Sequence, residues 1–103
     1  MARNYSQTTI KLLFGRSGNL CAFPGCLNPV IAPETEQSDA AVVGHICHIY
    51  AAADDGPRGR PGMTEEERDA AENLILLCGH HHQIVDKQYQ DYPADKLKTW
   101  KAI

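Results

Sequence analysis

The sequence predicts a small α+β domain in which two strands and a helix are flanked by further helices and stabilised by a bound metal. Three observations support this fold class. The chain has 103 residues, which is near the small end of what a single hydrophobic core can stabilise. Two short apolar segments have the pattern of strands. All four cysteines and all five histidines occur within residues 21–26, 42–49 and 78–82, and such clustering is typical of metal ligands.

The N-terminal third is predicted to contain a helix and a tight turn. Ser6 can cap a helix whose apolar residues Ile10, Leu13 and Phe14 share one face. Residues 21–26 read Cys-Ala-Phe-Pro-Gly-Cys, and the Pro-Gly pair favours a turn. We therefore expect the two cysteine thiols of this segment to approach each other.

The first strand is predicted over residues 42–49, where apolar and polar positions alternate. A period of two places His45 and Cys47 on one face of this strand and His48 on the other. Residues 51–63 are rich in glycine and proline and are predicted to form a loop.

The second half of the chain is predicted to contain a strand between helices. Thr64 followed by Glu67 forms a capping box that opens a short acidic helix to about residue 72. Residues 74–77 are predicted to be the second strand, and residues 80–88 a helix. A last helix is expected to open at residues 91–93, with Leu97 and Trp100 facing inward.

The net charge of −3 argues against a surface that coats nucleic acid without specificity. The charge is unevenly distributed. Residues 1–33 carry three basic and no acidic residues, whereas residues 34–72 carry ten acidic and three basic ones. A basic end of the molecule could therefore face phosphates while the acidic middle faces solvent or a partner.

We expect one domain over residues 1–103 in a reducing, cytoplasmic compartment, with no membrane partner. No segment approaches the about 18 apolar residues of a membrane span, and the N-terminus lacks the apolar core of a signal peptide. Cysteines in such a compartment are more often ligands than disulfides. A disulfide between Cys21 and Cys26 is the alternative, but it leaves the histidine cluster unexplained. The chain ends inside its last predicted helix, which leaves open that it is the N-terminal part of a longer protein.

The order of these features resembles the HNH endonuclease family, whose members adopt the ββα-metal fold. The resemblance covers nearly the whole chain. The residues that carry it are Cys47-His48-Ile49, Gly56, Asn73-Leu74, Leu77-Cys78 and His81-His82, framed by Cys21 and Cys26. More narrowly, Gly-Pro-Arg at residues 56–58 and Glu-Asn-Leu-Ile-Leu-Leu-Cys at residues 72–78 are similar to HNH domains of bacterial defence proteins.

The resemblance implies a catalytic site. His48 would be the general base that takes a proton from the attacking water, and Asn73 would make hydrogen bonds that fix the site. His82 would ligate a divalent metal that neutralises charge on the phosphate. Asp86 follows His82 by one helical turn, and its carboxylate would suit Mg²⁺ or Mn²⁺. The alternative for Asp86 is a solvated helix residue.

A separate structural zinc site is also implied. Zinc is commonly held by four cysteine or histidine ligands arranged as two short-spaced pairs. The expected ligands are Cys21, Cys26, Cys78 and His81. His80 competes with His81 by spacing, and Cys47 could join the set. Buried thiols in a core are the alternative interpretation.

The remaining candidates are residues for substrate binding and two residues to which the resemblance assigns no clear role. Arg58 is expected to contact phosphates, because guanidinium groups match phosphate oxygens in pairs, and Arg16 is a candidate for backbone contacts. The alternative is ordinary solvation in the loop, which is favoured for Arg60. The roles of Cys47 and His45 stay open: core packing is favoured for the cysteine, and a surface or secondary role for the histidine.

The sequence thus predicts an endonuclease that hydrolyses DNA phosphodiester bonds, with structural zinc and catalytic Mg²⁺, Mn²⁺ or Ni²⁺, and a role in antiphage defence. The residues do not distinguish DNA from RNA, and they leave a homo-oligomer or a fused regulatory domain open. The alternative is a non-catalytic zinc-knuckle module that binds nucleic acid or a protein, which the acidic middle of the chain and Cys47 favour.

Overall fold

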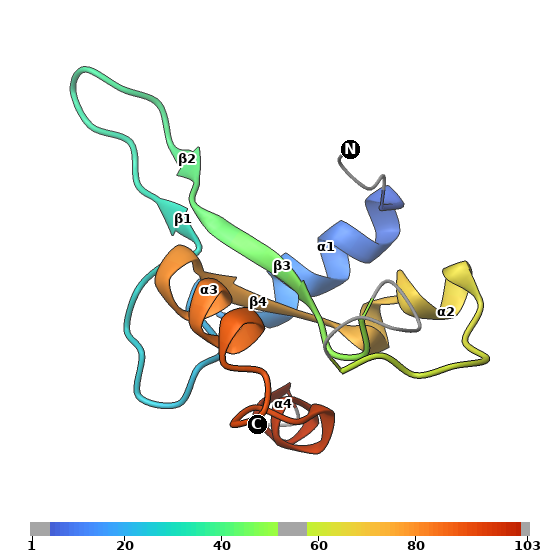
Figure 1. The fold of residues 1–103 in the computed structure, drawn as a ribbon. Helices are drawn as coiled ribbons and strands as arrows, with labels where there is room; N and C mark the ends of the chain where they lie inside the picture. The colour runs from blue at the N-terminus through green and yellow to red at the C-terminus, as the bar shows by residue number, and fades with distance from the viewer. Residues whose placement is uncertain (1–4, 52–57, 102–103) are drawn as a thin grey trace.

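A computed structural model of the chain describes residues 5–51 and 58–101 and confirms the predicted α+β class (Figure 1). Part of the predicted glycine-rich loop, including Gly56, lies outside the described residues. In chain order the elements are α1 (Gln7–Arg16), β1 (Ile31–Ala32), β2 (Ala41–Val42), β3 (Gly44–His48), α2 (Glu65–Arg68), the 3₁₀ helix η1 (Ala71–Asn73), β4 (Leu74–Cys78), α3 (Gly79–Lys87) and α4 (Ala94–Lys101).

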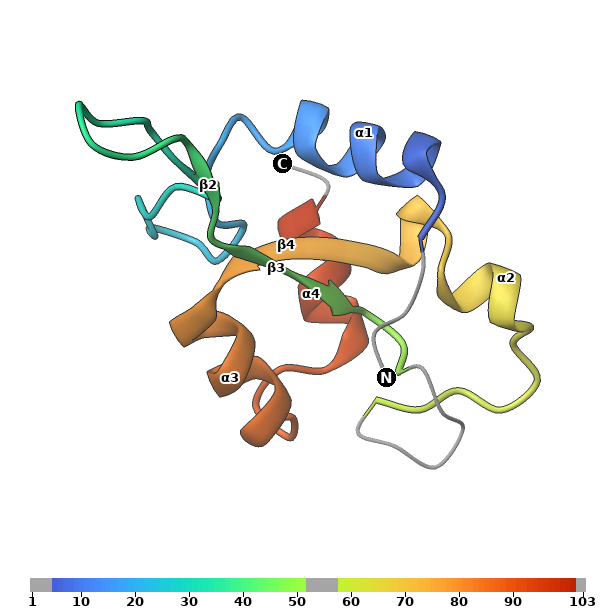
Figure 2. The ribbon, with the colours of Figure 1, turned by 90° about the horizontal axis from the view of Figure 1, so that it is seen from above.

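The centre of the fold is the antiparallel pair β3–β4. Its register sets Gly44 opposite Cys78 and His48 opposite Leu74. Helix α1 covers one face of this pair, and α3 and α4 cover the other (Figure 2). Every residue of β4 is buried as a result, which explains why this strand is apolar at each position rather than alternating.

Two groups of buried side chains lie on the two faces of β4. The group on the α1 side consists of Leu13, Val30, Leu74 and Leu76. The group on the side of α3 and α4 includes Cys47, Ile49, Ile75, Leu77, Val85, Leu97 and Trp100. Alternate residues of β4 thus enter different groups, as the period of two requires.

The prediction of one continuous strand over residues 42–49 is wrong at Val43. The backbone N–H groups of Val43 and Gly44 both donate to the carbonyl of Val30, each at 2.9 Å, and this bulge separates β2 from β3. A Cβ atom added at Gly44 would lie 2.6 Å from Cβ of Val30, so a larger residue would have to push the strand away.

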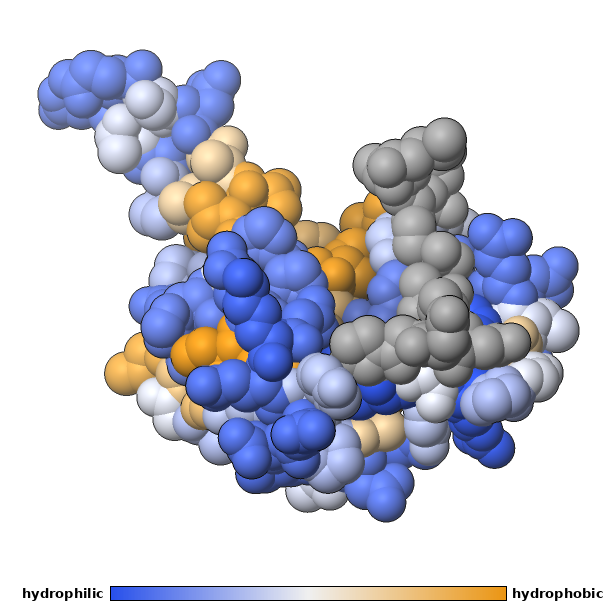
Figure 3. Space-filling model, viewed as in Figure 1, coloured by the Kyte–Doolittle hydropathy of each residue, from blue (hydrophilic) through white to orange (hydrophobic). Residues whose placement is uncertain are grey.

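Strands β1 and β2 form a short hairpin that projects from the body of the molecule (Figure 1). Apolar surface gathers at the base of this arm, whereas its tip is hydrophilic (Figure 3). Ile31, Val42 and Val43 are among the exposed apolar residues. The arm therefore contributes little to the core.

The two predicted helix caps are present. The hydroxyl of Ser6 accepts from the N–H of Thr9 at the start of α1. Thr64 and Glu67 form the reciprocal capping box of α2. This helix was predicted to reach about residue 72 but ends at Arg68, because Ala70 is extended and the chain continues as η1. None of the helices in the described part has the length and apolar character that a membrane span requires.

Candidate metal centres and active site

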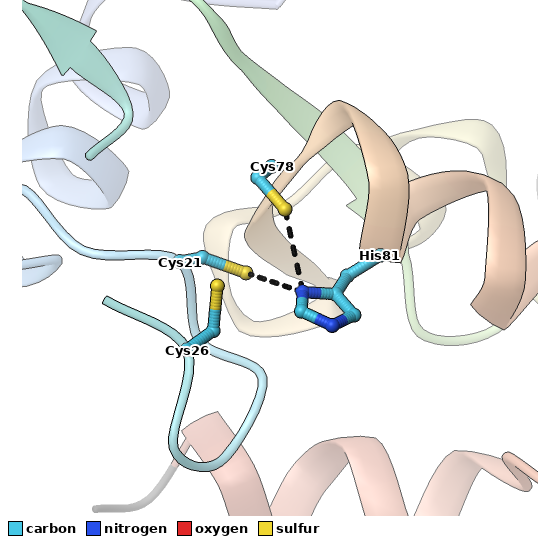
Figure 4. A group of neighbouring side chains, drawn as sticks. All are labelled: Cys21, Cys26, Cys78 and His81. Carbon is cyan, nitrogen blue, oxygen red and sulfur yellow. Dashed lines mark hydrogen bonds between the residues drawn. The ribbon is translucent and has the colours of Figure 1, made fainter. Parts of the chain in front are cut away.

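The four predicted zinc ligands converge from three segments (Figure 4). Cys21 and Cys26 lie in the loop after α1, Cys78 ends β4, and His81 is in the first turn of α3. Their ligand atoms all lie within 4.8 Å of one another. Nδ1 of His81 is 3.3 Å from Sγ of Cys78 and 3.7 Å from Sγ of Cys21. All four cysteines of the chain are free thiols rather than disulfides.

Local hydrogen bonds hold the loop that carries two of these cysteines. The N–H of Ala22 donates to the carbonyl of Leu76 in β4 at 2.9 Å, and that of Cys26 donates to the carbonyl of Phe23 at 3.0 Å. The turn passes through Gly25 with φ of +79°, a conformation that glycine adopts without steric cost. The ring of Phe23 also stacks on that of His81, with centroids 3.9 Å apart.

The protonation of this group suits a soft cation. Burial raises the pKa of the Cys21 thiol to about 11, so a cation would be needed to keep it ionised at neutral pH. Burial also opposes ionisation of Cys78, but hydrogen bonds from the His81 backbone and the Asn28 side chain outweigh it and lower that pKa. Burial lowers the pKa of His81, which favours the neutral imidazole that a metal needs. Three sulfurs and one imidazole nitrogen are a donor set that fits zinc.

The competing candidates lie outside this group. His80 is exposed and only meets the ring of His81 edge-on, with centroids 5.2 Å apart. Cys47 lies instead in a second group with His82 and Asp86, whose ligand atoms are also within 4.8 Å of one another.

This second group joins β3 to α3. Nε2 of His82 lies 3.2 Å from Oδ2 of Asp86, one helical turn away, and Sγ of Cys47 lies 3.7 Å from Oδ1 of the same carboxylate. The ring of His45 stacks on that of His82, with centroids 5.2 Å apart. Cys47 is thus packed in the core, as the sequence favoured, and also faces the two candidate ligands of the catalytic metal. One imidazole and one carboxylate could hold a divalent ion, with the thiol as a third donor.

The guanidinium of Arg58 reaches into the same group. It donates to Oδ1 of Asp86 at 2.7 Å and to the backbone carbonyls of His48, Ile49 and Val85 at 3.2, 3.1 and 2.9 Å. Only 5% of its side chain is exposed. The predicted phosphate contact would therefore require Arg58 to leave these partners.

The charges of this group follow from these contacts. Burial opposes ionisation of Asp86, but hydrogen bonds from His82 and Arg58 outweigh it and lower the pKa of the carboxyl to about 2. Burial raises the pKa of Cys47 to about 12. At neutral pH the group therefore presents one carboxylate, one thiol and a fixed guanidinium.

The side chain of His48 lies on the other face of β3. Its Nε2 is 3.1 Å from Oδ1 of Asp69, and its ring lies 6.0 Å from that of Tyr5. A hollow beside Asp69 is lined partly by Glu65 and Glu66, so a phosphodiester approaching from there would meet carboxylates. No local pattern indicated Asp69 as a partner of His48, because the two residues are 21 positions apart.

The side chain of Asn73, the residue before β4, forms hydrogen bonds with the chain that follows β3. Its side-chain N–H₂ donates to the carbonyls of Tyr50 and Arg68 at 2.9 and 2.8 Å, and its Oδ1 accepts from the N–H of Tyr50 at 2.8 Å. Asn73 is 6% exposed, so water cannot replace these partners. These bonds hold Tyr50, which follows β3, close to Asn73 and Arg68.

We expect Asn73→Ala to lower the free energy of unfolding by on the order of 2–4 kcal/mol, because it leaves buried backbone groups without partners. Urea unfolding of the zinc-loaded protein, followed by circular dichroism, measures the change. Gln83→Ala, at an exposed position of α3, is the control and should shift the transition little. Equal stabilities of the two variants would contradict the assigned role.

Arg16 lies at the exposed end of α1. It lines a hollow with Leu20, Pro24 and Trp100, and this hollow includes neither His48 nor the second metal group. The structure thus places Arg16 apart from His48 and from the group of Cys47, His82 and Asp86, and near the zinc ligand Cys21.

Comparison with known proteins connects this arrangement to a family. A sequence profile of a family described as HNH endonuclease matches residues 21–89, which is more than half of the chain. The matched range contains both metal groups, His48 and Asn73. A search of curated proteins finds no match.

Proposed function

The chain belongs to the HNH endonuclease family, and on that premise we propose that it hydrolyses phosphodiester bonds of DNA with a divalent metal and a histidine base. One observation supports this most strongly. His82 and Asp86 converge with Cys47 on one side of β3, and all three lie within the residues that the HNH endonuclease profile matches.

In this proposal each residue has a separate task. A divalent ion held by His82 and Asp86 would supply positive charge for the phosphate and the leaving oxygen. His48 would take the proton of the attacking water. Since Asp69 faces Nε2 of His48, an Nε2–H donated to this carboxylate leaves Nδ1 as the basic nitrogen. Water attacks phosphorus as the bond to the 3′ oxygen breaks, which gives a 5′ phosphate and a 3′ hydroxyl.

Cleavage of a supercoiled plasmid tests the proposal. We expect nicked circles with Mg²⁺, Mn²⁺ or Ni²⁺, and a rate about 100-fold or more lower for His82→Ala, because a metal ligand supports several kcal/mol of charge stabilisation. His80→Ala is the matched control, since the neighbouring histidine is exposed and should cleave at the normal rate. No cleavage with any of the three ions would overturn the proposal.

A second candidate function is a non-catalytic, zinc-stabilised binding module. It is favoured by the contacts of the two histidines: His48 meets Asp69 and Tyr5, whereas His82 meets His45 and Asp86 on the opposite face of β3. Bound zinc without plasmid cleavage would support this candidate over the nuclease.

We extend the proposal to antiphage defence because residues 56–58 and 72–78 resemble HNH domains of bacterial defence proteins. Cells expressing the protein should then reduce phage plating, and cells expressing His82→Ala should not. Equal plating on both would remove this extension while leaving the nuclease proposal intact.

A further inference from the structure

Two cations converge on one aromatic ring next to the end of β3. Nζ of Lys98 lies 4.5 Å from the centroid of the Tyr50 ring and donates to the Tyr50 hydroxyl at 2.8 Å. Cζ of Arg60 lies 5.1 Å from the same centroid. The three residues come from separate parts of the chain: the segment after β3, the loop before α2, and helix α4.

No carboxylate of the described residues pairs directly with the two cations of this cluster. Arg60 and Lys98 are both exposed. Arg60 does help to lower the pKa of Glu67, although the main cause is a hydrogen bond from the backbone of Thr64. Two like charges beside one ring repel each other, and a bound anion would relieve this repulsion.

Hydrogen bonds connect the cluster to residues of the candidate active site. The side chain of Asn73 bonds both the N–H and the carbonyl of Tyr50. The N–H of Ala51 donates to the carbonyl of Arg58 at 3.1 Å, which holds these two residues together next to Tyr50. The guanidinium of Arg58 then contacts Asp86, whereas that of Arg60 lies over the ring of Tyr50.

We propose that Tyr50, Arg60 and Lys98 hold the phosphate backbone of the DNA substrate beside the metal group of His82 and Asp86. This rests on the proposed function for the identity of the substrate. Exposed cations next to an aromatic ring suit a nucleic-acid backbone, because the cations neutralise phosphates and the ring offers a flat apolar surface to the sugar or base. In this proposal the cluster of Tyr50, Arg60 and Lys98, rather than Arg58 or Arg16, makes the backbone contacts.

Binding of a fluorescein-labelled DNA duplex, measured by anisotropy without added Mg²⁺ or Mn²⁺, tests this surface. The double variant Arg60→Gln/Lys98→Gln should bind at least 10-fold more weakly. Its plot of log binding constant against log salt should be shallower by about 1 to 2, since each lost phosphate contact lowers the slope by about 0.9. Both positions are exposed, so thermal unfolding and zinc content should not change.

Lys96→Gln is the matched control, because Lys96 lies on the same helix with its Nζ 5.2 Å from the centroid of a different ring, that of Tyr92. It should retain the affinity and the salt slope of the unmodified protein. Unchanged binding by the double variant, equal losses by Lys96→Gln, or no binding by the unmodified protein would each overturn the inference. Plasmid cleavage separates this outcome from the proposed function. If the unmodified protein cleaves and the double variant binds normally, only the inference about this cluster is wrong. If the double variant binds weakly but the unmodified protein does not cleave, only the proposed nuclease activity is wrong.

Discussion

Replacing Cys78 by serine should leave most of the domain unfolded at 25 °C. Cys78 ends the buried strand β4 and precedes α3, and its thiol lies 3.3 Å from Nδ1 of His81. Structural zinc contributes about 10–16 kcal/mol of apparent binding free energy in small zinc-finger peptides. The net stability of a domain is typically only about 5–15 kcal/mol, so loss of a ligand should remove much of what keeps this small chain folded. Circular dichroism and zinc content per chain measure the result.

Cys47→Ala is the control for loss of a buried thiol. Cys47 is 1% exposed but lies outside the zinc group. This variant should keep one zinc per chain and a cooperative unfolding transition, with a loss of stability typical of a small core truncation. If Cys78→Ser also keeps its zinc and its cooperative transition, the structural role of the group is wrong.

Short spacing made part of the metal chemistry predictable. Cys21 and Cys26 flank one turn, and Cys78 and His81 are three residues apart at the start of a helix, so each pair is local in the sequence. The joining of the two pairs is a long-range contact, and only the resemblance to a family suggested it. The alternation of side chains along β3 likewise predicted that Cys47 lies on the face opposite His48. It could not indicate that α3 would bring Asp86 against that face.

The orientation of Arg58 could not be predicted from residue type. Three of its acceptors are backbone carbonyls, which leave no trace in a sequence pattern. Arg58 also has φ of +58°, a conformation that is uncommon for residues other than glycine. The break at Val43 has a similar origin, since it depends on the carbonyl of Val30 rather than on any local pattern.

Cleavage by His48→Ala should be about 10²–10⁴-fold slower than by the unmodified protein, the usual contribution of a general base. Zinc content and DNA binding should be unchanged, because His48 lies outside both metal groups and outside the cluster of Tyr50, Arg60 and Lys98. His80→Ala again serves as the matched histidine control.

The same assay tests whether His48 and His82, which lie on opposite faces of β3, act on one phosphate. A loss of rate confined to His48→Ala and His82→Ala would require the substrate phosphate to lie at the end of the strand, where it can be reached from both faces. Cleavage that survives His48→Ala would assign proton transfer to another group and leave the contact with Asp69 a structural one.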